Sequence, residues 1–314
     1  MDHRIQFEEE RQAYSGTTDH IAQENDDPGM REIDAMYGAA DALSLQNAKK
    51  HRRVLWELSA VGTLLTMFFL LYDEAELYGL ILACGVMILS LFLIRTVADR
   101  SECHRKYLEY RVLAESARVQ YFLFLAGVDV RVTDLTPWSI TQGIPWVCGL
   151  LSDLPLVKVR EKQSVLDCWI RNQKTYHESK LHQMSRKNIR DNRVARVSLI
   201  VTIAAYFVAL VFEIMVARGL LGGVDVHLFR AIIKIVVGTM SAFTLFTGNY
   251  YGKMSLLNII DDHRRMAALY ERAEEQIAAE GESRELLLFL ARECLNENAA
   301  WYAYQNKNKP DLVI

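Results

Sequence analysis

Four long stretches of this chain contain no charged residue. Leu58–Tyr72, Leu77–Ile94, Val197–Phe212 and Ile235–Gly252 contain no Asp, Glu, Lys, Arg or His. An 18-residue run covers about 27 Å as a helix, close to the hydrocarbon core of a bilayer at about 30 Å. A helix buried in a soluble core would keep a polar face, and these runs have none. The pattern predicts transmembrane helices over about 54–72, 77–94, 197–217 and 231–252.

Basic residues gather on one side of the predicted spans. Four Lys or Arg residues within 49–53 precede the first run, and five within 186–196 precede the third. The turn between the first two runs is acidic instead and contains Asp73, Glu74 and Glu76. Because an excess of Lys and Arg marks the cytoplasmic side, we expect a multi-pass protein of the inner (plasma) membrane with both termini cytoplasmic.

The average composition conceals this division. The 314 residues are 51% hydrophobic and 24% charged with a net charge of -3, as in many soluble proteins. These values exclude a disordered chain and a basic nucleic-acid binder, so we expect no nucleic-acid partner. Five cysteines without paired spacing exclude a disulfide-stapled scaffold. Residues 1–48 contain no apolar stretch of the kind found in a cleavable signal peptide.

Helical periodicity continues outside the spans, so the predicted fold is all-α. Residues 1–30 are polar and predict a mobile arm, and residues 31–128 form a first helical-hairpin membrane unit. Residues 129–160 hold three of the five prolines and predict a Pro/Gly/Trp linker or an irregular cap. Residues 161–306 form a second hairpin unit with a C-terminal helix, and 307–314 a tail.

Local signals mark helix ends in the second unit. Ser164 and Asp167 have the spacing of a capping box, in which each side chain satisfies a free backbone amide of the other. Gly281 predicts the end of the helix that follows the fourth span, and Ser283 can cap the last helix.

Three polar-aromatic segments bear a family resemblance. They are 106–120, 169–177 and 290–301, and they include Tyr107, Tyr110, Arg111, Glu115, Trp169, Gln173, Glu293, Asn298 and Trp301. Together they resemble the bacterial SLATT superfamily, two-span helical hairpins found beside nucleotide-signal (SMODS) and SLOG sensor domains. The likeness is to the tandem, four-span members and covers about residues 31–305.

The resemblance implies a membrane effector in antiphage defence or biological conflict that forms pores or conducts ions. This chain shows no SLOG or TRPM-like sensor segment. The trigger is therefore expected from a separate sensor protein or a nucleotide second messenger. The motifs contain no catalytic residues.

The sequence offers little sign of catalysis. It contains no GxGxxG, GxxxxGK[ST], GxSxG or HExxH motif. Asp261, Asp262 and His263 are consecutive, so on a helix they would splay around the axis rather than converge on a metal. We therefore expect no enzymatic activity, no catalytic residues, no cofactor and no metal site. A membrane enzyme using these three residues remains a remote hypothesis.

Ionisable and amide side chains at membrane depth are costly in hydrocarbon and are the candidate functional residues. Glu57 is either paired with Arg53 one turn away or a pore-mouth carboxylate that attracts cations. Glu213 and Lys234 are predicted to pair across the second hairpin, the alternative being that each is separately solvated. Asn249 either bonds between helices or lines a pore.

Small residues predict close contacts between helices. Gly238 with Ala242, and Ser59 with Thr63 and Gly62 beside them, form ridges that suit either oligomer contacts or packing within one chain. The leading hypothesis is a gated homo-oligomeric ion channel or pore with slight cation preference, whose partners are the lipid bilayer and ions. The alternative is a non-conducting membrane anchor or receptor scaffold whose cytoplasmic helices bind a partner protein.

Overall fold

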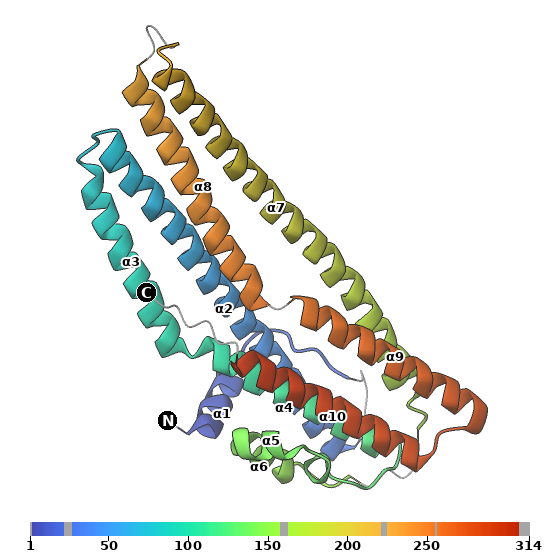
Figure 1. Cartoon of the computed structure of the whole chain (residues 1–314). Coiled ribbons are helices and arrows are strands. Elements are labelled where there is room, and N and C mark those ends of the chain that lie inside the picture. The colour runs from blue at the N-terminus through green and yellow to red at the C-terminus, as the bar shows by residue number, and fades with distance from the viewer. Residues whose placement is uncertain (1, 22–26, 158–162, 221–224, 255, 308–314) are drawn as a thin grey trace. The chain divides into compact units, whose positions relative to one another are not determined.

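A computed structural model describes residues 2–21, 27–157, 163–220, 225–254 and 256–307. These residues are helical apart from turns and short connections and contain no strand, which confirms the all-α fold (Figure 1). The main helices are α1 (His3–Ala13), α2 (Pro28–Glu74), α3 (Leu80–Ser101), α4 (Cys103–Leu125), α7 (Asn172–Ala217), α8 (Val226–Met254), α9 (Leu256–Glu280) and α10 (Arg284–Lys307).

Four helical segments of the described chain are long and apolar enough to cross a membrane. They are Pro28–Glu74, Leu80–Leu125, Leu166–Ala217 and Val226–Phe246. Each overlaps one of the four uncharged runs, so the four predicted spans correspond to four helices that are long and apolar enough to cross a membrane. The helices extend well beyond the apolar runs, because the flanking residues keep helical periodicity while becoming polar.

The chain divides into two compact units that interleave along the sequence. The helical body comprises Met1–Lys50, Glu102–Gln183 and Asn258–Ile314, and the span bundle comprises His51–Ser101 and Met184–Leu257. The sequence predicted two successive hairpin units instead. The difference arises because α2 and α7 each have a polar part that belongs to the helical body and an apolar part that belongs to the span bundle.

Helix α4 is the centre of the helical body. It buries sixteen of its residues, among them Tyr110, Leu113, Ala117 and Phe124. A helix that is covered on all sides can carry apolar residues all around, and α4 has no clear polar face. Helix α10 packs along it, and buries Leu290, Ala291 and Leu295.

The N-terminal segment is not the mobile arm that its polarity predicted. Residues His3–Ala13 form helix α1, which Asp2 caps by accepting a hydrogen bond from the Arg4 amide at 3.0 Å. Phe7 is fully buried and joins the core of the helical body. An otherwise polar helix thus contributes one large apolar residue to the core, which composition alone could not show.

The proline-rich segment that follows α4 is a cap rather than a linker. It contains the short helices η1 (Val132–Asp134), α5 (Trp138–Gly143) and α6 (Pro145–Asp153). Val147, Leu150 and Leu151 of α6 are buried in the same core as α4. The prolines shorten the helices without preventing them from burying apolar side chains.

Helix ends agree with the sequence at two sites and differ at a third. Gly281 follows α9 with a φ of +83°, and the Ser283 hydroxyl accepts a hydrogen bond from the Leu286 amide at 3.1 Å. The predicted capping box between Ser164 and Asp167 does not form, although the Ser164 hydroxyl accepts a hydrogen bond from the Leu166 amide at 3.3 Å. There a π-helix η2 (Leu166–Arg171) precedes α7, and the Ser164 hydroxyl donates to Glu282 at 2.5 Å. Asp167 pairs with Arg171 instead, with 2.7 Å between Oδ1 and Nη1.

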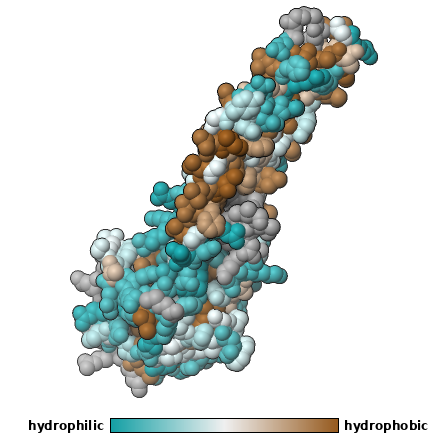
Figure 2. Space-filling view, turned by 90° about the vertical axis from the view of Figure 1, so that its left-hand side faces the viewer, coloured by the Kyte–Doolittle hydropathy of each residue, from teal (hydrophilic) through white to brown (hydrophobic). Residues whose placement is uncertain are grey.

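The span bundle exposes most of its apolar side chains. At most 17% of the residues in any of its apolar windows are buried. Figure 2 shows hydrophobic residues on the surface of its long helices, whereas the visible surface of the helical body is mainly hydrophilic. Such an apolar surface is suited to lipid contact and would be unfavourable in water. The chain is therefore a membrane-associated protein with four candidate transmembrane helices.

Candidate functional sites in the helical body and the span bundle

A chain of charged side chains crosses the core of the helical body. Arg111 of α4 donates to Asp41 of α2 with 2.6 Å between Nη1 and Oδ1, and also forms an ion pair with Glu115 one turn along α4. Arg118 pairs with Glu115 from the following turn. The side chains of Asp41, Glu115 and Arg118 are at most 14% exposed. Buried charges of this kind are stable only when they are paired, as these are.

The pKa values of the two carboxyl groups in this network shift in opposite directions. Burial raises the pKa of Asp41, although Arg111 partly offsets the effect. Burial would also raise the pKa of Glu115, but Arg111 and Arg118 hold it below its ordinary value. Glu115 is therefore held as a carboxylate between two guanidinium groups.

A second group of titratable side chains joins α7, α9 and α10. The Nδ1 atoms of His177 and His263 lie 3.0 Å apart, so one ring donates and the other accepts. His177 also stacks on Tyr270, whose hydroxyl lies 3.1 Å from the Cys294 sulfur. Burial lowers the pKa of His177 to about 3 and that of His263 to about 4. Both rings are therefore neutral at physiological pH.

Burial has the reverse effect on an acid near this group. Burial, together with the charges of Glu115 and Asp262, raises the pKa of Glu297 on α10 to about 7. Because acids and bases shift in opposite directions on burial, Glu297 and the histidines respond oppositely to pH. Sequence analysis did not single out Glu297, because neither its spacing nor its neighbours along the chain set it apart.

The residues that carry the family resemblance lie mostly in the interior of the helical body. Tyr110, Trp169, Gln173 and Asn298 are at most 6% exposed. Trp169 stacks on Phe122 with 5.2 Å between ring centroids. These contacts give the motif a packing role.

The remaining motif residues join the same helices. Tyr107 meets Trp301 edge to face with 5.5 Å between centroids, and Asn298 donates to the Val112 carbonyl at 3.3 Å. Arg111 and Glu115 belong to the charge network. Glu293 is partly buried on α10. The resemblance motifs thus lie on the elements that hold α4, α7 and α10 together.

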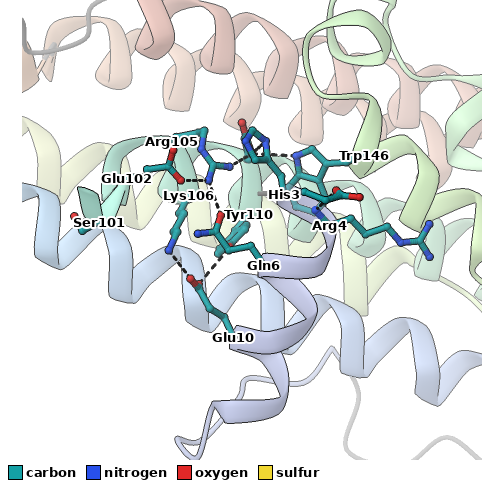
Figure 3. A network of polar contacts seen from close by, with 12 residues as sticks. His3, Arg4, Gln6, Glu10, Ser101, Glu102, Arg105, Lys106, Tyr110 and Trp146 are labelled. Atoms are coloured by element: carbon teal, nitrogen blue, oxygen red, sulfur yellow. Dashed lines mark hydrogen bonds and ion pairs between the residues drawn. The ribbon is translucent and has the colours of Figure 1, made fainter. Parts of the chain in front are cut away.

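The first turns of α4 are tied to α1 by a polar network (Figure 3). Glu10 accepts hydrogen bonds from Lys106 at 2.5 Å and from Tyr110 at 3.1 Å. Arg105 donates to Gln6 at 2.6 Å, to Glu109 of its own helix and to Glu102, which precedes that helix. The buried Phe7 ring of α1 meets Tyr110 of this network with 5.1 Å between centroids. The contacts between the two helices cannot be read from the sequence, since the partners lie about 100 residues apart.

The ion pairs of the span bundle differ from those predicted. Glu213 of α7 accepts two hydrogen bonds from Arg230 of α8, at 2.6 and 2.5 Å. Lys234 instead contacts Glu74 at the end of α2, with 2.8 Å between Nζ and Oε1. The predicted Glu213–Lys234 pair is therefore wrong. The planar guanidinium of Arg230 suits a two-point contact with a carboxylate, which a lysine does not offer.

The other candidate residues near the spans either pair within their own helix or are exposed to solvent. Glu57 pairs with Arg53 at 2.9 Å, as the i,i+4 alternative predicted. Asp73 and Glu76 are exposed, and Glu76 adopts a φ of +56° in the turn after α2. Asn249 lies in α8, but its side chain falls outside the described part of the structure.

The predicted small residues include two close contacts between α2 and α8. A methyl group at Gly62 would lie 2.6 Å from Cζ of Phe246, and one at Gly238 would lie 2.5 Å from Cδ1 of Leu70. Ser59 donates to the Leu55 carbonyl of its own helix, and Ala242 is partly buried. The two glycines therefore serve packing within one chain.

Asp261, Asp262 and His263 do not converge. Asp261 pairs with Arg264, Asp262 with Arg265, and His263 turns toward His177. Within the described ranges, no three His, Cys, Asp or Glu side chains are placed to hold a metal ion.

Together these features define an all-α, membrane-associated protein with four candidate spans and a separately packed helical body. No family model, curated protein or solved structure matches the chain.

Proposed function

We propose that this chain is an ion-conducting or pore-forming effector of the bacterial inner membrane. It acts as a gated homo-oligomer with both termini in the cytoplasm. The supporting observation is that charged pairs lie on the spans yet stay accessible. The side chains of Glu213, Arg230 and Lys234 are 41–60% exposed in the single chain. Because charged side chains are costly in hydrocarbon, we expect these residues to face a water-filled vestibule or an interface between copies of the chain.

The depth of these residues agrees with a pore entrance. Glu213 lies five residues inside Arg218 and Lys234 four residues inside Arg230, which is about 6–8 Å along a helix at about 1.5 Å per residue. Glu57 and Glu74 are already paired with cations. Asp73 and Glu76 are exposed carboxylates of the same turn, so they supply the proposed cation preference.

Continuous helices provide a route for gating. Helix α2 carries Asp41 of the buried charge network and ends at Glu74, and α7 carries His177 and Glu213. A rearrangement of the charge network would therefore act on α2, and a rearrangement of the histidine pair would act on α7, and both helices contain spans. The SLATT resemblance supports the same role and implies a separate sensor protein or a nucleotide second messenger as trigger.

Ion flux from liposomes containing the purified chain tests the proposal. We expect flux in the activated state, and we expect the double variant Asp73→Asn/Glu76→Gln to reduce cation over anion permeability. Glu271→Gln, which changes an exposed carboxylate of the helical body, is the matched control and should leave selectivity unchanged. Absence of flux with every tested sensor protein and cyclic nucleotide would contradict the proposal.

The alternative function is a membrane anchor or receptor scaffold. The well-packed helical body favours it, since that unit contains most of the buried core. A scaffold predicts a stable complex with one cytoplasmic protein and no ion flux under any condition.

A further inference from the structure

Cations gather on α2 and α7 just before two of the apolar stretches begin. Arg52 lies two residues before Val54, and Lys187, Arg190 and Arg193 lie within ten residues of Val197. All four belong to the span bundle. Arg190 and Arg193 are exposed, and the Arg190 side chain is 74% accessible. By their place in the sequence, these side chains stand at the level of the lipid headgroups.

Two of the four cations, Lys187 and Arg190, interact with one carboxylate, that of Asp191. Asp191 is buried, and its Oδ1 lies 3.7 Å from Nε of Arg190. Its Oδ2 is buried without a hydrogen-bond partner. Arg53, the next residue after Arg52, is already paired with Glu57. The cluster therefore carries an excess of positive charge, which an anion from outside the chain would balance.

The cations act on one another across the two helices. Burial lowers the pKa of Lys187, and the charges of Arg52 and Arg190 lower it further, whereas Asp191 raises it. Arg52 comes from α2 and the other residues from α7. The positive cluster therefore joins two helices and is not only a row along one of them.

Apolar side chains lie next to these cations. Ile189, Val194 and Val197 of α7 are 61%, 39% and 54% exposed. A free inorganic anion would leave them in water. A ligand that joins an anionic group to a hydrocarbon chain would cover both the charges and the apolar surface.

We propose that Arg52, Lys187, Arg190 and Arg193 form a binding site for the headgroup phosphate of an anionic phospholipid. Guanidinium groups match phosphate oxygens with two parallel hydrogen bonds, and basic pockets between membrane helices select anionic headgroups. The acyl chains lie against Ile189, Val194 and Val197. The site requires only that the four helices span a bilayer, so it does not depend on ion conduction.

Native mass spectrometry of the full chain in a neutral detergent tests the site. The probes are phosphatidylglycerol, phosphatidylcholine and inorganic phosphate. We expect phosphatidylglycerol to bind at least tenfold more tightly than phosphatidylcholine, and 0.5 M salt to reduce this preference through screening. Each cation removed should weaken binding about fivefold, so Arg190→Gln/Arg193→Gln should lose about 25-fold.

Matched variants separate the site from a general effect of charge. Arg264→Gln removes an exposed arginine of α9 in the helical body and should retain the lipid preference. Circular dichroism checks that the double variant stays folded, and Arg52→Gln provides a second test from α2. The proposal would be overturned if the two lipids bound equally or if both site variants kept the preference for phosphatidylglycerol. It would also be overturned if inorganic phosphate bound as tightly as phosphatidylglycerol.

Discussion

At the scale of single residues, Arg111 is the cation on which the buried network of the helical body depends. It satisfies Asp41 on one helix and Glu115 on another. Removing one partner of a buried pair leaves an uncompensated charge, which costs far more than losing an exposed pair. The family-like motif therefore contains a residue whose importance is structural, whatever the trigger of the protein is.

We expect Arg111→Met to destabilise the helical body by about 3–5 kcal/mol. Thermal unfolding in detergent, followed by tryptophan fluorescence, measures the effect. The control is Arg171→Met, which removes a 51% exposed arginine and its two surface pairs and should cost at most about 1 kcal/mol. Equal midpoints for the two variants would contradict a central role for Arg111.

The His177–His263 pair predicts a loss of stability in acid. Both pKa values lie below the ordinary value of 6.5, at about 3 and about 4. The unfolded chain therefore binds more protons than the folded one between about pH 4 and 6.5. Stability is complete above about pH 6.5 and falls on acidification, by up to about 1.4 kcal/mol per pH unit for each ring. His263→Gln should flatten this dependence, as measured by unfolding midpoints from pH 4 to 8.

Glu297 is expected to have the opposite effect on the pH dependence of stability, so it serves as a control for the histidine pair. Its pKa is raised to about 7, so between about pH 4.5 and 7 the folded chain binds the extra proton, and acidification stabilises it. Glu297→Gln should therefore make the acid loss steeper, whereas His263→Gln makes it shallower. If the unfolding midpoints of the wild type and both variants changed in parallel with pH, the protonation of these groups would not be coupled to folding.

At the scale of elements, α1 is held by Phe7 and by polar contacts to the first turns of α4. We expect Phe7→Ala to detach α1 at a cost of about 3–5 kcal/mol, because truncating a buried aromatic ring loses its packing. Amide hydrogen exchange should show lost protection within His3–Ala13. Ile5→Ala, at a 53% exposed position of the same helix, should leave protection intact. Unchanged exchange in the Phe7 variant would mean that the polar contacts suffice.

The contact between α2 and α8 predicts a second effect at this scale. We expect Gly62→Ala to lower the thermal midpoint of the chain in detergent, because the added methyl group meets the Phe246 ring and overpacking costs about 1–3 kcal/mol. Gly85→Ala on α3 meets nothing within 4 Å, and it should be neutral or stabilise the helix by up to about 1 kcal/mol. The reverse order of midpoints would rule out a tight α2–α8 contact.

At the scale of the whole molecule, the proposed topology, in which all four candidate helices cross the membrane, places both connecting turns on one face. We expect Glu76→Cys and Arg218→Cys, each in a chain without its natural cysteines, to react with an impermeant maleimide added to intact cells. Asp153→Cys in the helical body should react only after permeabilisation. The second and third spans lie between these two turns, so the chain crosses the membrane twice and both turns face the same side. Labelling of Glu76→Cys and Arg218→Cys from opposite faces would therefore contradict four spans.

Some features of this molecule depend only on residues that are close in the sequence. The four spans could be predicted because a bilayer demands about 20 apolar residues in a row, and a linear pattern records this directly. Gly281 and Ser283 marked helix ends for the same reason, since capping uses atoms a few residues away. The Arg53–Glu57 contact lies within one turn and was equally visible.

Tertiary structure decided which distant side chains meet. Glu213 and Lys234 were recognised as exceptional, yet their partners are Arg230 and Glu74. The His177–His263 contact and the docking of α1 join residues on separate helices. A charge reveals in the sequence that it needs a partner, but the choice among several opposite charges depends on helix packing and side-chain geometry. The spans are therefore a property of the sequence pattern, whereas the charge network exists only once the helices have packed.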